Sequence, residues 1–121
     1  MRCRKKIKLL PELSELLASL RSEGKKIIHC HGVFDLLHVG HIRYLEHAKK
    51  LGEVLVVTLT QDHNVKKGPN RPAFTEDLRA ESLAALDCVD YVAINQWPTA
   101  VETIKLLKPD FYVKGSDYKD S

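Results

Sequence analysis

The sequence has few cysteines, few aromatic residues and no long apolar segment. Its 121 residues include three cysteines, and aromatic residues make up 7% of the chain. An odd number of widely spaced cysteines argues against a disulfide framework and fits reduced thiols. No apolar run approaches the roughly 20 residues that a membrane span requires, and the basic N-terminus leads into Pro11 rather than into the apolar core of a signal peptide. These features predict a cytoplasmic protein.

Excess charge of one sign is also nearly absent. Lys and Arg number 19 against 16 Asp and Glu, which gives a formal net charge of +3, and the cations form no long block. The sequence therefore gives no indication of a nucleic-acid partner. Its length fits a single domain, residues 1–121, of which residues 1–10 form a basic lead-in; we expect residues 2–8 to be frayed.

The apolar pattern predicts helices and strands in alternation. Short apolar runs indicate strands at residues 27–31, 54–59, 91–94 and 111–113. Helical spacing indicates a first helix around residues 13–20 and later helices at residues 38–51, 75–89 and 99–108. Strands separated by helices form right-handed βαβ units and a parallel sheet with helices on both faces. The expected fold is a Rossmann-like three-layer α/β/α sandwich.

Finer patterns predict how individual helices begin, end and pack. Gly52 stands where the helix at residues 38–51 should end. Thr99 and Glu102 have the spacing of a capping box, so Thr99 is expected to cap the last helix. The buried side of the helix at residues 75–89 is expected to consist of Leu78, Ala85, Leu86 and Val89.

Polar segments follow the carboxyl end of every predicted strand. Ligands of parallel α/β sheets bind beyond these ends. The segments are residues 31–41, 60–71, 95–97 and 114–117. The second of them contains a local basic cluster of Lys66, Lys67 and Arg71, and Asp62, which we interpret as a loop-structural or acceptor-side residue. The sequence thus predicts one binding rim at this edge of the sheet.

The most informative stretch runs from Gly32 to His41. Glycine lets backbone N–H groups approach a ligand, and a helix start adds unpaired N–H groups and the positive end of the helix dipole. His38 and His41 lie three residues apart, so on a helix they share one face. This arrangement predicts a nucleoside triphosphate site in which both imidazoles donate hydrogen bonds to phosphates.

The pattern Gly-x-Phe-Asp-x-x-His-x-Gly-His at residues 32–41 resembles the signature of the HxGH nucleotidylyltransferase (cytidylyltransferase-like) superfamily. Members transfer a nucleotidyl group from an NTP to a phosphorylated acceptor and release pyrophosphate. Arg71-Pro72 and residues 113–118 are most similar to the heptose 1-phosphate adenylyltransferase domain. The resemblance implies a transfer from ATP to a sugar 1-phosphate such as heptose 1-phosphate, with Mg²⁺ as cofactor. It is also compatible with a homodimer and with fusion to, or work alongside, a sugar kinase.

The resemblance implies roles for individual residues. His38, His41 and Lys66 would be catalytic, with Lys67 as the alternative to Lys66. Asp35 would hold Mg²⁺ through the phosphates. The nucleotide-binding residues would be Gly32, Val33, Phe34, Asp35, Gly40, Arg71, Arg79, Lys114, Gly115 and Asp117.

Other interpretations remain open. The same motif would serve a CTP-dependent transfer to glycerol 3-phosphate or another polyol phosphate. Family members continue into a Ser/Thr-rich phosphate-binding unit, whereas this sequence ends at Ser121. We therefore expect either a C-terminally truncated fragment of a longer protein or a nucleotide-binding module without catalysis. A metal site on His29 and His31 is a further alternative; on the main interpretation His29 is a packed strand residue and His31 lies near the phosphates or the acceptor.

Overall fold

The computed structural model describes residues 2–65, 72 and 74–114. Within this part of the chain, four strands form one parallel sheet in the order β3-β2-β1-β4. The strands are β1 (Ile27–Gly32), β2 (Val54–Thr60), β3 (Tyr91–Asn95) and β4 (Phe111–Tyr112). The helices are α1 (Leu10–Ser22), α2 (Val39–Lys49), α3 (Glu76–Ala84) and α4 (Val101–Leu107), with 3-10 turns η1 (Arg2–Lys6) and η2 (Asp62–Asn64).

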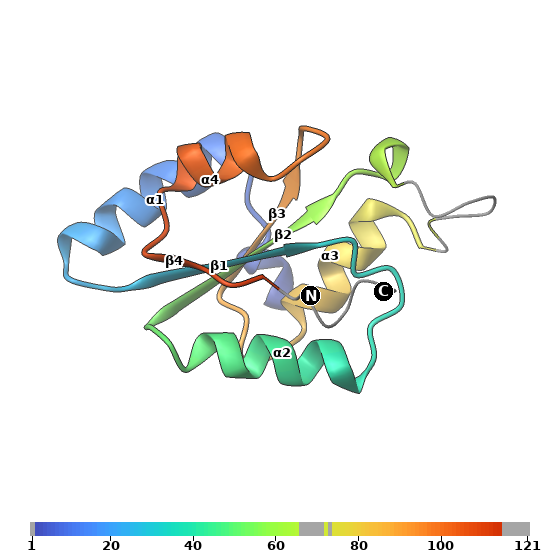
Figure 1. Cartoon of the computed structure of the whole chain (residues 1–121), viewed down its shortest axis with the longest axis horizontal. Helices are drawn as coiled ribbons and strands as arrows, with labels where there is room; N and C mark the ends of the chain where they lie inside the picture. The colour runs from blue at the N-terminus through green and yellow to red at the C-terminus, as the bar shows by residue number, and fades with distance from the viewer. Residues whose placement is uncertain (1, 66–71, 73, 115–121) are drawn as a thin grey trace.

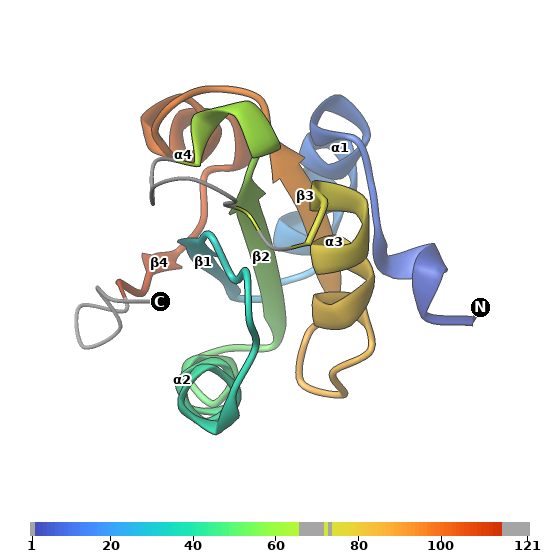
Figure 2. The same ribbon diagram turned by 90° about the vertical axis from the view of Figure 1, so that its right-hand side faces the viewer.

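Helices cover both faces of the sheet. Figures 1 and 2 show α1 and α4 on one face and α2 and α3 on the other. Leu13 and Leu17 of α1 pack with Val56 of β2 in one core layer, whereas Leu45 of α2 and Leu83 of α3 belong to the other layer. β2 is buried along its whole length, which explains its nearly continuous apolar sequence. The predicted Rossmann-like three-layer sandwich is confirmed.

The order of the strands creates a switch point beside β1. The chain steps from β1 through α2 to β2 and through α3 to β3. It then returns through α4 on the opposite face to form β4, which pairs with the other edge of β1. Loops that leave neighbouring strands toward opposite faces open a crevice for ligands at the carboxyl ends of those strands. The stretch that begins at Gly32 lies at this position.

Residues 2–8 of the N-terminal lead-in are ordered, contrary to the expectation that they would be frayed. Residues of η1 form a 3-10 turn, and Lys6 Nζ donates to the carbonyl oxygen of Leu86 at 3.0 Å. Ile7 forms a parallel bridge with Val92, and Lys8 N–H donates to the Val92 carbonyl at 2.8 Å. The lead-in thus covers the outer edge of β3, where unpaired backbone groups would otherwise be exposed.

Two helix predictions were wrong. Leu78 is 49% exposed and Ala85 is exposed, because α3 ends at Ala84 and turns a different side toward the sheet. The N-cap residue of α4 is Ala100 rather than Thr99, and Ala100 makes no side-chain capping bond; Thr99 Oγ1 accepts from Val101 N–H at 3.4 Å, one position earlier than predicted. The Thr99 carbonyl accepts a hydrogen bond from Asn95 Nδ2 at 2.8 Å, within the turn that leads into the helix.

No helix in the described part of the chain combines the length and the apolar character needed to cross a membrane.

Gly52 follows α2 at a point of close packing. A Cβ atom there would lie 2.8 Å from Ile28 Cδ1 and 2.9 Å from the Lys26 carbonyl oxygen. We expect Gly52→Ala to lower the free energy of unfolding by about 1–3 kcal/mol, because the backbone oxygen cannot give way cheaply. Urea denaturation measures the change. Leu51→Ala, at an exposed neighbouring position, is the control and should stay within about 0.5 kcal/mol; equal losses for both variants would contradict the packing argument.

Candidate active site

The loop after β1 is held in place by a buried aromatic ring. Phe34 is 4% exposed, and its ring meets the His41 imidazole edge-on with centroids 5.6 Å apart. Its φ of 51° is a left-handed conformation, which costs a non-glycine residue roughly 1–2 kcal/mol. Burial of the ring offsets this with roughly 1.5–3 kcal/mol. A Cβ at Gly32 would lie 3.0 Å from Phe34 Cε2, so glycine at this position leaves the ring its space.

Both motif histidines accept backbone hydrogen bonds at the start of α2. Gly40 N–H donates to His38 Nδ1 at 3.0 Å, and His38 N–H donates to His41 Nδ1 at 3.2 Å. The two rings are 4.0 Å apart between centroids; His38 is exposed and His41 is buried. Because each Nδ1 accepts from a backbone N–H, each neutral imidazole carries its proton on Nε2. The start of α2 therefore has two imidazole N–H donors as well as its own backbone N–H groups.

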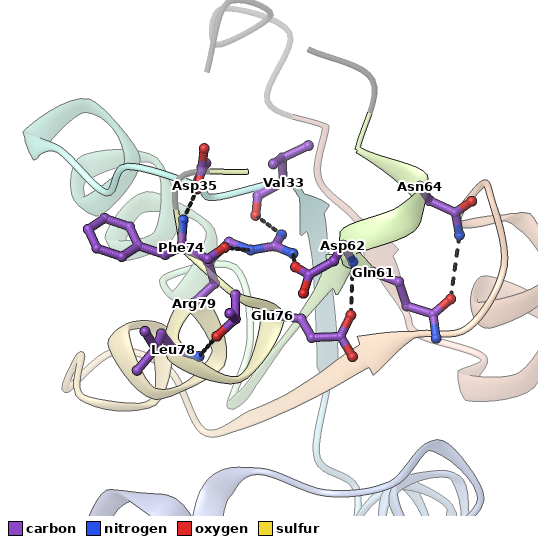
Figure 3. Close-up of polar contacts among 10 residues, drawn as sticks. Val33, Asp35, Gln61, Asp62, Asn64, Phe74, Glu76, Leu78 and Arg79 are labelled. Atoms are coloured by element: carbon purple, nitrogen blue, oxygen red, sulfur yellow. Dashed lines mark hydrogen bonds and ion pairs between the residues drawn. The ribbon is translucent and has the colours of Figure 1, made fainter. Parts of the chain in front are cut away.

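Asp35 connects this loop to the segment before α3. Its side chain is buried, and its Oδ1 accepts a hydrogen bond from Phe74 N–H at 3.0 Å, as Figure 3 shows. One carboxylate oxygen is thus oriented by the backbone at the start of α3. A carboxylate fixed in this way can help to hold a hard divalent cation that also binds phosphate oxygens.

Arg79 joins three segments of the rim with one guanidinium group (Figure 3). The side chain is fully buried, and its Nε donates to the Phe74 carbonyl at 3.1 Å. Nη1 donates to the Val33 carbonyl at 2.8 Å, and Nη2 donates to Asp62 Oδ1 at 2.7 Å. Asp62 N–H in turn donates to Glu76 Oε1 at 2.8 Å. These contacts give Arg79 and Asp62 structural roles; a contact of Arg79 with nucleotide stays a prediction.

A second pair of imidazoles lies on the α1/α4 face of the sheet. His29 Nε2 and His31 Nδ1 each lie 2.8 Å from Thr58 Oγ1, and His31 Nε2 lies 3.5 Å from Thr60 Oγ1. His29 is fully buried and meets the Tyr112 ring edge-on at 5.1 Å, as expected for a packed strand residue. Burial lowers the pKa of His29 to about 3 and that of His31 to about 4. Both rings are therefore neutral at pH 7.

Helix α2 holds the segment after β4 beside β1. The Tyr44 hydroxyl donates to the Val113 carbonyl, and Val113 N–H donates to the His29 carbonyl at 2.9 Å. Lys114 follows at the same end of the sheet with an exposed side chain. The predicted base- and ribose-recognition segment thus begins next to the loop that carries the histidine motif.

The structure brings one group of predicted site residues together at the carboxyl end of β1: Gly32, Val33, Phe34, Asp35, His38, Gly40 and His41. Lys114 follows the neighbouring strand, and Arg79 contacts Val33. Five further predicted residues lie outside the described residues: Lys66, Lys67, Arg71, Gly115 and Asp117. Their roles stay predictions.

The sequence analysis did not identify Thr58 and Phe74, which hydrogen-bond residues of the site. Thr58 bridges His29 and His31, and the Phe74 backbone binds both Asp35 and Arg79. A signal for Thr58 was present, because it is a polar residue inside an apolar, fully buried strand. No sequence signal marks Phe74, since it acts through its backbone.

A family model described as cytidylyltransferase-like matches residues 29–121. The chain belongs to the cytidylyltransferase-like family.

Within that family it is similar to proteins named bifunctional protein HldE. The HldE of Trichlorobacter lovleyi is 46% identical over 115 residues, which are 93% of this chain and 23% of the relative. The HldE of Aliarcobacter butzleri is 49% identical over 93% of this chain and 24% of the relative. The chain thus spans about a quarter of the length of these relatives.

A solved structure has the same arrangement. The crystal structure of the lipopolysaccharide core biosynthesis protein from Thermoplasma volcanium is 35% identical, with a TM-score of 0.68. The match covers 74% of this chain and 73% of that protein. The chain thus shares its fold with a solved protein to which it is 35% identical.

Loss of the Arg79 guanidinium should destabilise the protein, because this group holds three segments of the binding rim together. We expect Arg79→Ala to lower the free energy of unfolding by about 3–5 kcal/mol, because it removes a buried, charge-assisted set of hydrogen bonds and leaves two carbonyls without their donor. Arg79→Lys should recover only part of this loss, since an ammonium cannot reach three acceptors in a planar fork. Urea denaturation measures both, with the exposed Arg43→Ala as control. A change below about 1 kcal/mol for Arg79→Ala would refute the interpretation.

The buried imidazole of His29 should make stability depend on pH. Its pKa is lowered from 6.5 to about 3, so protons bind the unfolded chain more strongly and acid favours unfolding. The contribution is complete above pH 6.5 and declines as the pH falls toward 3. Between pH 7 and pH 5 the expected loss is about 2 kcal/mol. His29→Gln should remove that part of the pH dependence in denaturant titrations at both pH values; an unchanged difference between the two pH values would contradict it.

Proposed function

We propose that this domain transfers a nucleotidyl group from a nucleoside triphosphate to a phosphorylated acceptor. The observation that carries the proposal is the pair of imidazoles at the start of α2, each with Nδ1 occupied by a backbone N–H. Both rings are thereby oriented as Nε2–H donors at the positive end of a helix. This combination suits the oxygens of a triphosphate, and the family to which the chain belongs supports the same chemistry.

The chemistry requires electrostatic stabilisation more than a covalent nucleophile. An oxygen of the acceptor phosphate attacks the α-phosphorus in line, a new phosphorus–oxygen bond forms, and the bond to the pyrophosphate leaving group breaks. The attacking phosphate is already anionic near neutral pH, so no strong general base is needed. His38 and His41 donate hydrogen bonds where negative charge accumulates, on the equatorial oxygens and on the departing pyrophosphate. Backbone N–H groups of the Gly32–Phe34 loop add further donors.

Further residues complete the proposed site. Lys66, or Lys67 in its stead, and Arg71 would neutralise phosphate charge. Lys114, Gly115 and Asp117 would bind base and ribose. Asp35 would hold Mg²⁺ together with phosphate oxygens, and its buried, backbone-oriented carboxylate fits that cation, which binds through one or two carboxylates at such sites. When bound, Mg²⁺ would neutralise part of the triphosphate charge.

For the substrates we propose ATP and a sugar 1-phosphate such as heptose 1-phosphate. The support is the resemblance of Arg71-Pro72 and residues 113–118, together with relatives named bifunctional protein HldE that match over 93% of this chain. Because those relatives are about four times as long as the match, we also propose that the domain works with a sugar kinase that supplies its acceptor. The description cytidylyltransferase-like makes CTP with glycerol 3-phosphate the second pair to test.

Removal of either motif imidazole should stop turnover without unfolding the protein. We expect His38→Ala and His41→Ala to lower the rate of pyrophosphate release by about 10²- to 10³-fold, because each removes a donor to the transition state. The assay combines ATP or CTP with heptose 1-phosphate, other sugar 1-phosphates or glycerol 3-phosphate, in the presence of Mg²⁺. His47→Ala, an exposed histidine on the same helix, is the matched control and should keep its full rate.

The outcomes separate the interpretations. Nucleotide binding without pyrophosphate release from any pair would refute the enzyme and favour a binding module. Full activity of His38→Ala and His41→Ala would refute their role in the reaction. Faster release with CTP and glycerol 3-phosphate than with ATP and sugar 1-phosphates would refute the proposed substrates and leave the reaction type intact.

A further inference from the structure

The α1/α4 face of the sheet changes from apolar to polar along its strands. Its first half consists of Ile27, Val54, Val56 and Ala93, which pack with α1 and α4 in one core layer. Its second half, toward the carboxyl ends, consists of His29, His31, Thr58, Thr60 and Asn95. Buried polar groups are retained where hydrogen bonds satisfy them or a ligand needs them. The histidine motif of α2 uses none of these residues.

Hydrogen bonding fixes the tautomers in this polar half. Thr58 Oγ1 lies 2.8 Å from His29 Nε2 and from His31 Nδ1, and a hydroxyl has one proton to donate. It therefore donates to one ring and accepts from the other. His29 Nδ1 is buried without a hydrogen-bond partner. A buried, unpaired N–H is rarer than a buried, unpaired acceptor, so the proton of His29 lies on Nε2 and is donated to Thr58.

The tautomer of His29 determines where the proton of His31 lies, at the carboxyl end of β1. Since Thr58 receives the His29 proton, its own hydroxyl donates to His31 Nδ1, and the proton of the His31 ring lies on Nε2. That N–H lies beside the Thr60 hydroxyl at 3.5 Å, the outer limit of a hydrogen bond, and His31 is only half-buried. The partial exposure of His31 lets a ligand oxygen approach its ring, beside which the Thr60 hydroxyl lies. His31 and Thr60 thus form a pair of neutral hydrogen-bonding groups at the carboxyl ends of β1 and β2.

We propose that His31 Nε2–H and Thr60 Oγ1 bind a hydroxyl group of the acceptor, so that this pair selects polyhydroxy acceptors, and that His29 is a positioning residue that acts through Thr58. The inference rests on the proposed function, because it names the subsite for the second substrate. The triphosphate has its donors at the start of α2, on the opposite face of β1. The acceptor then approaches from the α1/α4 face, across the switch point.

The choice of a hydroxyl over a phosphate follows from charge. His31 and Thr60 lie on strands, whereas His38 and His41 donate at the positive end of α2. The neutral ring of His31 therefore donates one hydrogen bond without the helix dipole that favours a phosphate, which matches an uncharged hydroxyl. The lowered pKa of His31 agrees with this, since burial keeps the ring neutral across the physiological range. Selection by such a pair is strong, because an acceptor without the hydroxyl leaves polar groups in the site unpaired.

Nitrogen-15 NMR of the histidine rings tests the hydrogen-bond network without any turnover. We expect His31 in the wild-type protein at pH 7 to be neutral with its proton on Nε2. Thr58→Val should turn His31 into a mixture of tautomers while His38 stays unchanged. Addition of glycerol 3-phosphate or a sugar 1-phosphate should shift the His31 signals, and inorganic phosphate alone should not. A His31 proton on Nδ1, or equal shifts with inorganic phosphate, would overturn the proposal.

Steady-state kinetics tests the selectivity. With the acceptor that gives pyrophosphate release, His31→Phe should raise the acceptor KM about tenfold, the effect of one lost hydrogen bond, and leave the nucleotide KM nearly unchanged. His31→Gln, which keeps an N–H near the position of Nε2, should recover most of the loss. Thr60→Val is a second variant, which should also raise the acceptor KM and leave the nucleotide KM nearly unchanged. His47→Phe is the control. Equal changes in both KM values, or none, would overturn the proposal.

The proposal and the proposed function fail in different ways. Acceptor-induced shifts at His31 without pyrophosphate release from any pair would refute the reaction and support the subsite. Normal transfer with an unchanged acceptor KM in His31→Phe and Thr60→Val would refute the subsite and leave the reaction standing.

Discussion

The guanidinium group of Arg79 is the interaction on which the rim depends. A fully buried cation costs several kcal/mol of desolvation, which only well-placed acceptors can offset. Here the acceptors come from the loop after β1, the loop after β2 and the segment before α3. None of these segments can move without leaving the charge or a carbonyl unsatisfied. The position of Val33, and with it the start of the histidine motif, is therefore coupled to the start of α3.

Three imidazoles of the site share one arrangement of hydrogen bonds. In His38 and His41, Nδ1 accepts a backbone N–H, and in His31 it accepts from the Thr58 hydroxyl. Each ring is thereby oriented from its Nδ1 side and offers a donor on Nε2. Such donors are fixed before a ligand arrives, so they lose little freedom when it binds. In His38 and His41, which lie at the start of α2, this is the property that stabilisation of a developing phosphate charge requires.

Sequence pattern predicted the sheet and the histidine motif because both depend on local chemistry. Apolar runs bounded by turn residues determine the strands, and β1 and β2 ended within one residue of their predicted limits. Contacts between distant segments could not be predicted in the same way. Leu78 is exposed because α3 packs through the side that carries Arg79 and Leu83, and the burial of Arg79 follows from a carboxylate 17 residues away.

Alternate side chains of β1 point to opposite faces of the sheet, and the two sets have different roles. Ile28 and Cys30 point into the core layer of α2 and α3, where burial raises the pKa of the Cys30 thiol to about 11 and keeps it an inert packing group. His29 and His31 point to the other face. A shift of β1 by one residue would exchange these sets, burying imidazoles against α2 and α3 and moving the thiol to the rim. The register of β1 against β2 thus determines both the core and which hydrogen-bond donors reach the carboxyl end of the sheet.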